Sequence, residues 1–159
     1  MSKIVNNLQE LVQICKKNKK KTIVFTNGCF DILHIGHVNY LKKSKELGDI
    51  LIVGLNSDSS VKRLKGANRP INSEENRAAV LEALEFVDYI YVFDDTTPLE
   101  IISKIHPNIY TKGGDYKMDC IIGPNIGSKV IENYGGKVIL IPIEYDISTT
   151  GIINKILNL

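Results

Sequence analysis

Two kinds of hydrophobic pattern alternate along the 159-residue chain. One is a short run in which nearly every residue is apolar, which is typical of a strand buried on both faces of a parallel sheet. The other places apolar residues three or four positions apart, as in Ile4, Leu8, Leu11 and Cys15, and is typical of an amphipathic helix. The predicted strands are residues 22–27, 49–58, 88–95, 108–115 and 137–143, and the predicted helices are residues 3–17, 37–47, 73–87, 97–106, 124–134 and 148–157.

The regular alternation of strands and helices predicts the fold class. It favours an α/β protein with a doubly wound parallel sheet of five strands, built as a single domain over residues 1–159. Residues 1–21 are expected to form an N-terminal amphipathic helix and a basic turn, followed by the core at 22–157. The polar stretch at 59–72 is predicted to be a loop. Because such sheets bind ligands at the carboxyl ends of their strands, we expect the chemistry there.

Composition narrows the class of partners. The net charge of +2 does not require nucleic acid or another polyanion, and no apolar run approaches the roughly 18 residues of a membrane span. Three widely spaced cysteines without a CxxC pair favour neither a disulfide framework nor a zinc site, so we expect a cytoplasmic protein. The lysine-rich stretch at 16–21 is interpreted as the solvated end of the first helix rather than as a nucleic-acid patch.

The segment TNGCFDILHIGH, at 26–37, carries the strongest candidate chemistry. Gly28 follows a predicted strand and permits a tight turn. If His34 and His37 lie in the first turn of a helix, both rings project from one face beside unpaired backbone N–H groups, which attract phosphate. Gly36 would leave room for a phosphate chain. The spacing alone also permits a chance pair of surface histidines. A metal site is disfavoured because no third ligand stands at the usual spacing, so no metal ligand is predicted.

Three further groups follow other predicted strands. Hydroxyl side chains open the last predicted helix at Ser148, Thr149 and Thr150, where they either cap the helix or hold phosphates. The predicted 59–72 loop contains four cations, Lys62, Arg63, Lys65 and Arg69, and Arg77 follows early in the next helix. These five side chains are either solvated charges or partners of a pyrophosphate. The KGGDY segment contributes Lys112, Gly113 and Asp115, in a turn that is either structural or approached by a ligand.

Taken together, these segments resemble a known family. TNGCFDILHIGHVNYL, LGDILIVGLNSDSSVKRLKG, RPI, NRAAVLEAL, VDYIYVFDDTTP, KGGDY and STT follow one another at its spacing. The chain is similar to the cytidylyltransferase-like nucleotidyltransferases, and more narrowly to the D-glycero-β-D-manno-heptose 1-phosphate adenylyltransferases of bacterial ADP-heptose synthesis. The resemblance covers residues 22–157, which it implies to be the catalytic core.

The resemblance implies a Rossmann-like sheet and transfer of AMP from ATP, with Mg²⁺, to a heptose 1-phosphate. Homodimers are common among such proteins, and in many bacteria the domain is fused to a sugar kinase, so here a separate kinase is the expected partner. His34 and His37 match the pair that binds phosphates and stabilises the transition state. The other matched residues are Thr26, Gly28 and Phe30 in the nucleotide-binding first loop, Asp31 as its ordering acid, Lys65 and Arg77 as triphosphate cations, and Ser148, Thr149 and Thr150 as the helix-start triplet.

One departure bears on the substrate. Related cytidylyltransferases have an Arg-Thr-x-Gly run before the triplet, whereas this chain has Glu144-Tyr145-Asp146-Ile147. This argues against a glycerol-phosphate cytidylyltransferase, although other phosphorylated acceptors, FMN adenylylation and a non-catalytic nucleotide-binding module stay open. An aminoacyl-tRNA synthetase is excluded, because the chain is too short and lacks both a KMSKS-like motif and an anticodon-binding segment. No motif distinguishes adenine from cytosine on physical grounds.

Overall fold

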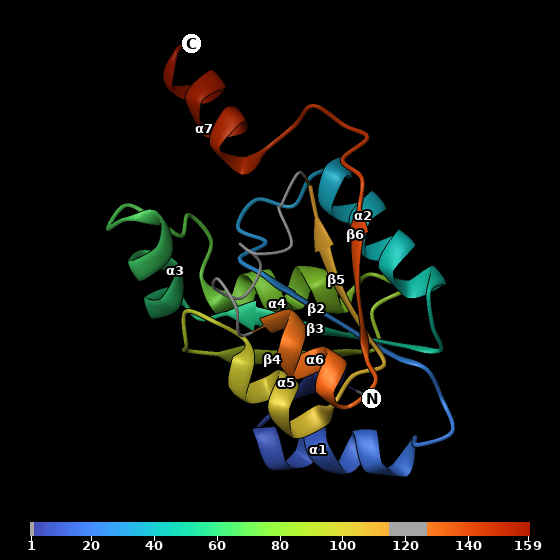
Figure 1. Ribbon diagram of the computed structural model, residues 1–159. Helices are drawn as coiled ribbons and strands as arrows, with labels where there is room; N and C mark the ends of the chain where they lie inside the picture. Colours follow the sequence, from blue (N-terminus) through green and yellow to red (C-terminus); the bar gives the residue numbers. More distant parts are fainter. Residues whose placement is uncertain (1, 115–126) are drawn as a thin grey trace.

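A parallel sheet of six strands forms the middle layer of this single α/β domain (Figure 1). The computed structural model describes residues 2–114 and 127–159. The strands are β1 (Ile4–Val5), β2 (Ile23–Gly28), β3 (Ile50–Asn56), β4 (Tyr89–Phe93), β5 (Ile109–Gly113) and β6 (Lys137–Ile141). Every residue of β3 is buried, as its continuous apolar sequence ILIVGLN predicts for a central parallel strand.

The strand order β1-β4-β3-β2-β5-β6 places the site of ligand binding. From β2 the chain moves outward to β3 and β4, and then crosses back to lay β5 on the other side of β2. The direction of winding therefore reverses between β2 and β5, which pair through Val24 with Ile109 and Phe25 with Tyr110. In open α/β sheets the crevice at the carboxyl ends of two such strands is the usual binding site.

Helices cover both faces of the sheet and bury alternate side chains of each strand. On one face, α1 (Leu8–Lys17), α5 (Leu99–Ile105) and α6 (Gly127–Asn133) pack on a cluster that contains Phe25 and Ile52. On the other face, α2 (Ile35–Glu46) and α4 (Glu74–Glu82) pack on a cluster that contains Val24, Leu51 and Val53. The remaining helices are α3 (Asp58–Lys65) and α7 (Thr149–Leu157), and α7 lies at the opposite end of the molecule from α1 (Figure 1).

Two sequence-based expectations about the elements are wrong. The sheet has six strands rather than five, because Ile4–Val5 leaves the predicted first helix and pairs with Ile90 and Tyr91 at the sheet edge. The helix begins only at Leu8, since Asn7 caps it by accepting a hydrogen bond from the Glu10 amide. The predicted 59–72 loop contains α3, whose cap Ser57 accepts from the Ser60 amide at 3.1 Å.

No helix among residues 2–114 and 127–159 is both long and apolar enough to cross a membrane.

Candidate active site

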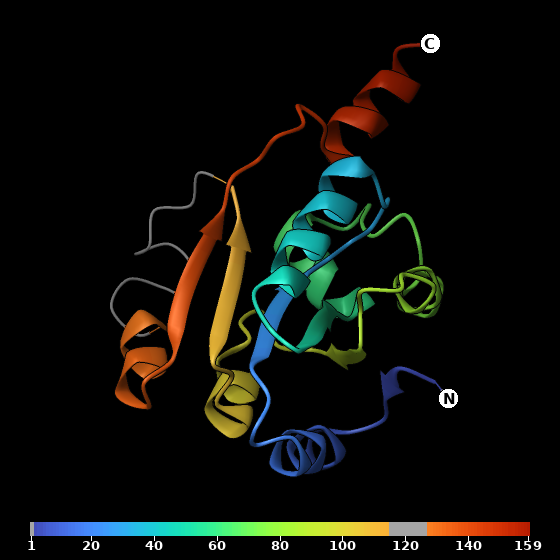
Figure 2. The ribbon, with the colours of Figure 1, turned by 90° about the vertical axis from the view of Figure 1, so that its right-hand side faces the viewer.

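A cleft of about 560 Å³ opens at the carboxyl ends of β2 and β5, and the N-terminal ends of α2 and α7 line it. Figure 2 shows α7 next to the N-terminal end of α2. It brings together residues that stand more than a hundred positions apart in the sequence, such as Gly28 and Thr149. The predicted site residues that line it are Gly28, Phe30, Asp31, His34, Gly36, His37, Lys65, Lys112, Gly113, Ser148, Thr149 and Thr150.

The two histidines stack against each other at the start of α2. His34 is the N-cap and its side chain makes no capping hydrogen bond, while His37 lies in the first turn. Their ring centroids are 3.8 Å apart with an interplanar angle of 23°. A Cβ atom at Gly36 would lie 3.0 Å from His34 Nδ1, so a larger residue at this position would press on the imidazole. Glycine at this position therefore permits the stacked pair.

Both imidazoles are neutral near pH 7. Burial, the larger cause, and the neighbouring His34 together lower the pKa of His37 to about 4, against the opposing effect of a hydrogen bond to the Ile32 backbone. Burial also lowers the pKa of His34. Within the described part of the chain, the buried Nδ1 atoms of both rings have no hydrogen-bond partner. The pair thus carries hydrogen-bonding capacity that the protein itself does not use.

The turn between β2 and α2 supports this pair. Phe30 has a φ of 45°, a left-handed conformation that is uncommon for a bulky residue, and its ring contacts His37 edge-on with centroids 5.3 Å apart. A Cβ atom at Gly28 would lie 2.9 Å from the Phe30 ring, which explains why glycine ends β2. The turn thereby fixes one side of the His37 ring.

The cations grouped by sequence separate in the structure. Lys65 and Arg69 line the cleft and are joined there by Lys112 from β5, whereas Lys62 and Arg63 do not line it. Burial and, in smaller part, Lys65 lower the pKa of Lys112 to about 8, against an opposing effect of Cys29. Two lysines that repel each other in one cleft favour the binding of an anion between them.

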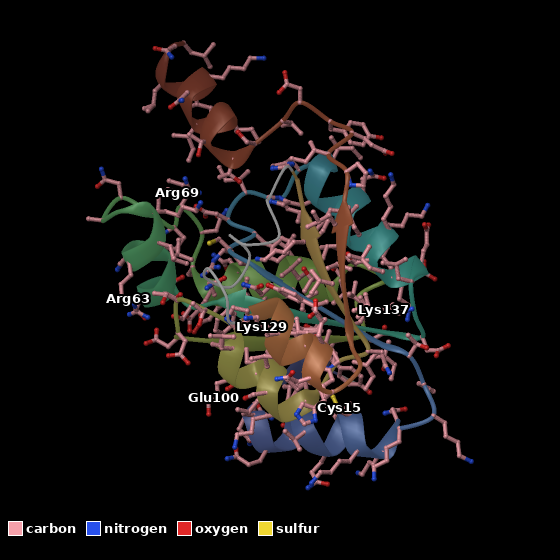
Figure 3. All side chains as sticks on the ribbon, viewed as in Figure 1. Cys15, Arg63, Arg69, Glu100, Lys129 and Lys137 are labelled. Carbon is pink, nitrogen blue, oxygen red and sulfur yellow. The ribbon has the colours of Figure 1, made fainter. Side chains whose placement is uncertain are left out.

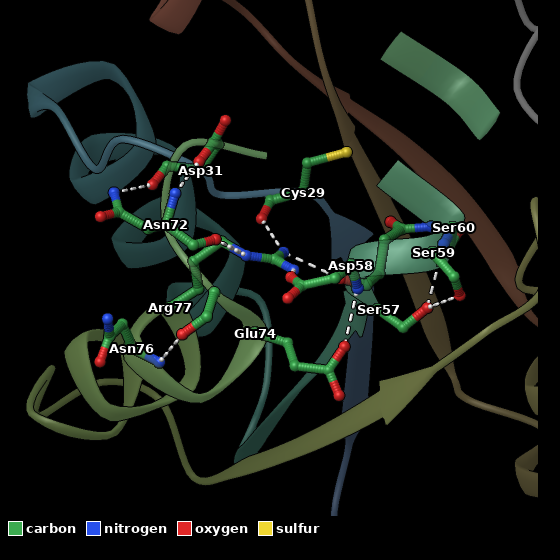
Figure 4. Close-up of polar contacts among 12 residues, drawn as sticks. Cys29, Asp31, Ser57, Asp58, Ser59, Ser60, Asn72, Glu74, Asn76 and Arg77 are labelled. Atoms are coloured by element: carbon green, nitrogen blue, oxygen red, sulfur yellow. Dashed lines mark hydrogen bonds and ion pairs between the residues drawn. The ribbon is translucent and has the colours of Figure 1, made fainter. Parts of the chain in front are cut away.

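Arg77 is buried behind the cleft wall and does not line it. Figure 4 shows its contacts. Its Nε donates to the Asn72 carbonyl at 3.0 Å, one terminal nitrogen donates to the carbonyls of Cys29 at 2.6 Å and Asn56 at 2.8 Å, and the other pairs with Asp58 at 2.7 Å. The guanidinium therefore ties the first loop to the start of α3. This placement does not support the expected direct contact with a triphosphate.

Two other predicted site residues, Thr26 and Asp115, are not among the described residues that line the cleft. Thr26 is fully buried, and its hydroxyl donates to the Thr111 carbonyl at 3.2 Å and hydrogen-bonds with the Tyr40 hydroxyl at 2.5 Å. Its side chain therefore joins β2, β5 and α2 rather than facing a ligand. Asp115 lies outside the described residues.

The start of α7 forms the opposite wall. Ser148 is the N-cap and accepts a hydrogen bond from the Gly151 amide at 3.0 Å, which confirms the predicted cap. Thr149 donates its hydroxyl hydrogen to the Ile32 carbonyl at 3.3 Å and so ties α7 to the turn before α2. Two helix starts therefore face one cleft, and each presents backbone N–H groups.

Sequence reasoning missed several residues of the wall. Tyr40 stands three positions after His37, on the same side of α2, and this helical spacing was the available signal. Glu144 also lines the cleft and pairs with Lys43 and with Asn39. Asn27 lies at the end of β2, where its carbonyl faces Lys112 Nζ at 3.5 Å. The sequence had pointed to Glu144 only as part of the segment 144–147 that departs from the family pattern, not as a residue of the cleft.

Comparison with known proteins agrees with this Rossmann-like architecture. A solved lipopolysaccharide core biosynthesis protein from Thermoplasma volcanium is 32% identical with a TM-score of 0.61, covering 79% of this chain and 99% of its own. A pantoate-beta-alanine ligase from Francisella tularensis has a TM-score of 0.64 at 16% identity over all of this chain and 79% of its own, which shows a likeness of fold only.

The sequence model of the cytidylyltransferase-like family matches residues 25–155, and the chain belongs to that family. This relationship supports a nucleotidyltransferase activity. The bifunctional protein HldE of Syntrophotalea carbinolica is 49% identical over 152 residues, and that of Campylobacter jejuni is 54% identical over 154 residues. These alignments cover 96% and 97% of the chain but only 30% and 32% of the relatives. The chain therefore spans about a third of the length of the curated relatives it matches.

Proposed function

We propose that this chain transfers AMP from ATP to a heptose 1-phosphate, which gives ADP-heptose and pyrophosphate. The convergence of the two stacked imidazoles with Lys65 and Lys112 in one cleft carries the proposal. The choice of heptose 1-phosphate follows the motif resemblance, and the identity of 49–54% with HldE proteins along nearly the whole chain supports it.

In the proposed reaction, an oxygen of the sugar phosphate attacks the α-phosphorus of ATP. The new P–O bond forms as the bond from the α-phosphorus to the oxygen that bridges it to the β-phosphorus breaks, and pyrophosphate leaves with that electron pair. The nucleophile is already an anion, so no general base is required. The protein instead has to bring two anions together and hold them in line.

The cleft residues supply this positioning. A neutral imidazole has one N–H. His34 can donate its N–H to an oxygen of the reacting phosphate, and His37 can do so in the tautomer that carries the proton on Nδ1, the ring nitrogen without a partner among the described residues, where a donor is most effective as charge develops. Lys65 and Lys112 offset the charge of the leaving pyrophosphate. On the opposite wall, Ser148 and Thr150 offer hydroxyl donors and the start of α7 offers backbone N–H groups, while Thr149 holds this wall in place through its hydrogen bond to the Ile32 carbonyl.

Mg²⁺ is expected to accompany ATP, and the described residues do not form a protein-held site for it. Both carboxylates that line the cleft are engaged, Asp31 with Arg69 and Glu144 with Lys43. Nor do residues 2–114 and 127–159 contain a group of three or more His, Cys, Asp or Glu side chains placed to hold a metal. An ion that enters with ATP would therefore be held by phosphate oxygens and water.

One assay tests the proposal. The protein is incubated with Mg²⁺, each of the four nucleoside triphosphates and a panel of phosphorylated acceptors, while pyrophosphate release is followed. We expect release with ATP and heptose 1-phosphate only. Release with CTP and glycerol phosphate would contradict the substrate assignment. Binding without release for any pair would favour the non-catalytic nucleotide-binding module.

The proposed function also implies an oligomeric state, a compartment and a partner. We expect a homodimer in the cytoplasm that receives its sugar phosphate from a separate heptose kinase, without a nucleic-acid or membrane partner. Analytical ultracentrifugation of the purified protein tests the dimer, and co-purification with the kinase tests the association.

A further inference from the structure

Arg69 combines a fixed edge with unused donors. Its Nε donates to Asp31 at 2.7 Å, its side chain is 14% exposed, and it lines the cleft. Across the described ranges 2–114 and 127–159, its two terminal nitrogens contact no acceptor. Arginine usually pairs with a carboxylate through two nitrogens at once. Here only Nε is engaged, so the terminal fork stays available.

Asp31 holds that edge firmly. Its carboxylate is about 1% exposed and also accepts the backbone N–H groups of Ile71, at 2.8 and 2.9 Å, and Asn72, at 2.9 Å. Burial raises the pKa of Asp31, but these hydrogen bonds and Arg69 outweigh burial and leave the pKa below its ordinary value. The carboxylate is thus a charged anchor whose donors come from the same short segment that carries Arg69.

A chain of hydrogen bonds connects this anchor to Arg77. Asn72 donates its side-chain amide to the Asp31 carbonyl at 2.6 Å, and its own carbonyl accepts from Arg77 (Figure 4). Arg77 is a buried support with four acceptors, whereas Arg69 faces the cleft with its fork unused. Figure 3 shows Arg69 at the end of the α3 region nearer to α7, and Arg63 at the end farther from it.

The local charge favours an anion in front of Arg69. The Cys29 thiol, which lines the cleft, is within electrostatic range of Lys65, Arg77, Arg69 and Lys112, although burial is the larger influence and raises its pKa. Of the two carboxylates that line the cleft, Asp31 is the one paired with Arg69, and it already accepts hydrogen bonds from three donors. A guanidinium held along one edge loses little side-chain freedom when its fork meets two phosphate oxygens.

We infer that Arg69 is a further phosphate-binding residue of this cleft and that Asp31 is the positioning residue that presents it. The inference rests on the proposed function for its substrates. The chemistry recognised is a pair of phosphate oxygens, which either the triphosphate of ATP or the sugar 1-phosphate can supply.

Direct binding measurements test the inference without requiring turnover. Isothermal titration calorimetry gives the affinities of wild type, Arg69→Ala, Arg69→Lys and Arg63→Ala for pyrophosphate, for a non-hydrolysable ATP analogue with Mg²⁺ and for heptose 1-phosphate. We expect Arg69→Ala to weaken at least one anion about tenfold or more, as for loss of a charge-assisted hydrogen bond. Arg69→Lys should recover part of the loss, since it keeps the charge but not the fork.

The arms of the titration identify the source of the phosphate. Loss for pyrophosphate and the ATP analogue assigns Arg69 to the triphosphate, and loss for heptose 1-phosphate alone assigns it to the acceptor. Arg63→Ala is the matched control, because Arg63 pairs with Asp94 away from the cleft, and its affinities should stay within twofold of wild type. Unchanged affinity of Arg69→Ala for all three ligands overturns the inference, even if its thermal stability falls.

A double-mutant cycle tests the positioning role of Asp31. If Asp31→Asn weakens binding through Arg69, it should have no further effect on affinity in the Arg69→Ala background. Additive losses would overturn that role. Should Asp31→Asn fail to fold, Asp31→Glu takes its place in the cycle. If the wild-type protein binds pyrophosphate but does not turn over heptose 1-phosphate, the proposed function fails. The assignment of Arg69 is then still decided by the affinities measured for the Arg69 variants.

Discussion

The wall of the cleft and the support behind it each contain an arginine, but they differ in how much of their hydrogen-bonding capacity is used. On the wall, His34 and His37 each have a buried ring nitrogen without a partner, and Arg69 is engaged through one edge. Behind the wall, Arg77 contacts four acceptors and is only 2% exposed. Unused hydrogen-bonding atoms beside a cleft indicate binding, whereas fully used ones behind it indicate support.

The largest expected effect is a loss of stability on replacing Arg77, the residue that supports the cleft wall from behind. Arg77→Ala would leave Asp58 without its cation and the carbonyls of Cys29 and Asn56 without their donor, so we expect a loss of about 3–5 kcal/mol in the free energy of unfolding. Urea denaturation measures the loss. Arg69→Ala should cost less, because Asp31 keeps two backbone donors. A stable Arg77→Ala protein that has lost only nucleotide binding would reverse the comparison.

On the wall, His37→Ala should lower kcat on the order of 10²-fold or more, as removal of other oxyanion donors does, with little change in thermal stability. Steady-state kinetics with ATP and heptose 1-phosphate measure the effect. His106→Asn is the control, because His106 caps α5 far from the cleft at a φ of 45°, a conformation that asparagine tolerates. Near-normal turnover by His37→Ala would remove the catalytic assignment.

The charge of Lys112 predicts how anion binding depends on pH. With a pKa of about 8, the amine is largely protonated at pH 7 and largely neutral at pH 9. Pyrophosphate affinity should therefore fall roughly tenfold over that interval, the value of one charge-assisted hydrogen bond. Calorimetric titrations at pH 7, 8 and 9 check this. Lys112→Gln should bind more weakly at pH 7 and show a flatter profile, and an equally steep profile in the variant would rule Lys112 out as the cause.

The smallest effect concerns the protonation of His37. Because its pKa is about 4, its ring resonances in an NMR titration should hardly move between pH 8 and 6. Below pH 6.5, His37 binds a proton in the unfolded chain but not in the folded protein. The free energy of unfolding should therefore fall as the pH decreases from 6.5 toward 4. His37→Asn should lose this part of the pH dependence in urea melts. A ring that titrates near pH 6.5 would contradict the burial argument.

Sequence periodicity predicted the inner sheet well, because strands such as β3 are buried on both faces and carry unbroken apolar runs. It failed at Ile4–Val5, since two β-branched residues at helical spacing from Leu8 are compatible with either element until β4 is present to pair with them. It failed again at Asp58–Lys65, where a helix without a long apolar stripe is determined by its Ser57 cap and by packing of Val61.

The placement of some site residues could likewise be predicted from the sequence, and that of others could not. The placement of His34 and His37 follows from a helix start after a strand, and the sequence contains both signals. The difference between Arg69 and Arg77 does not follow from it, because both are cations beside the same loop. Only tertiary contacts decide which guanidinium meets buried carbonyls. Thr26 illustrates the same limit, since its hydroxyl is taken up by Tyr40 and Thr111, which are distant in sequence.

The last helix, α7, contributes to the cleft but not to the core. No residue of α7 is buried, so neither side-chain cluster of the sheet depends on it, yet its first turn forms one wall of the cleft. A proteolytic cut within residues 142–147 that releases α7 should therefore weaken substrate binding, because the cleft loses one wall, while the core stays folded. The wall that α7 supplies can thus be removed without removing the core residues that line the rest of the cleft.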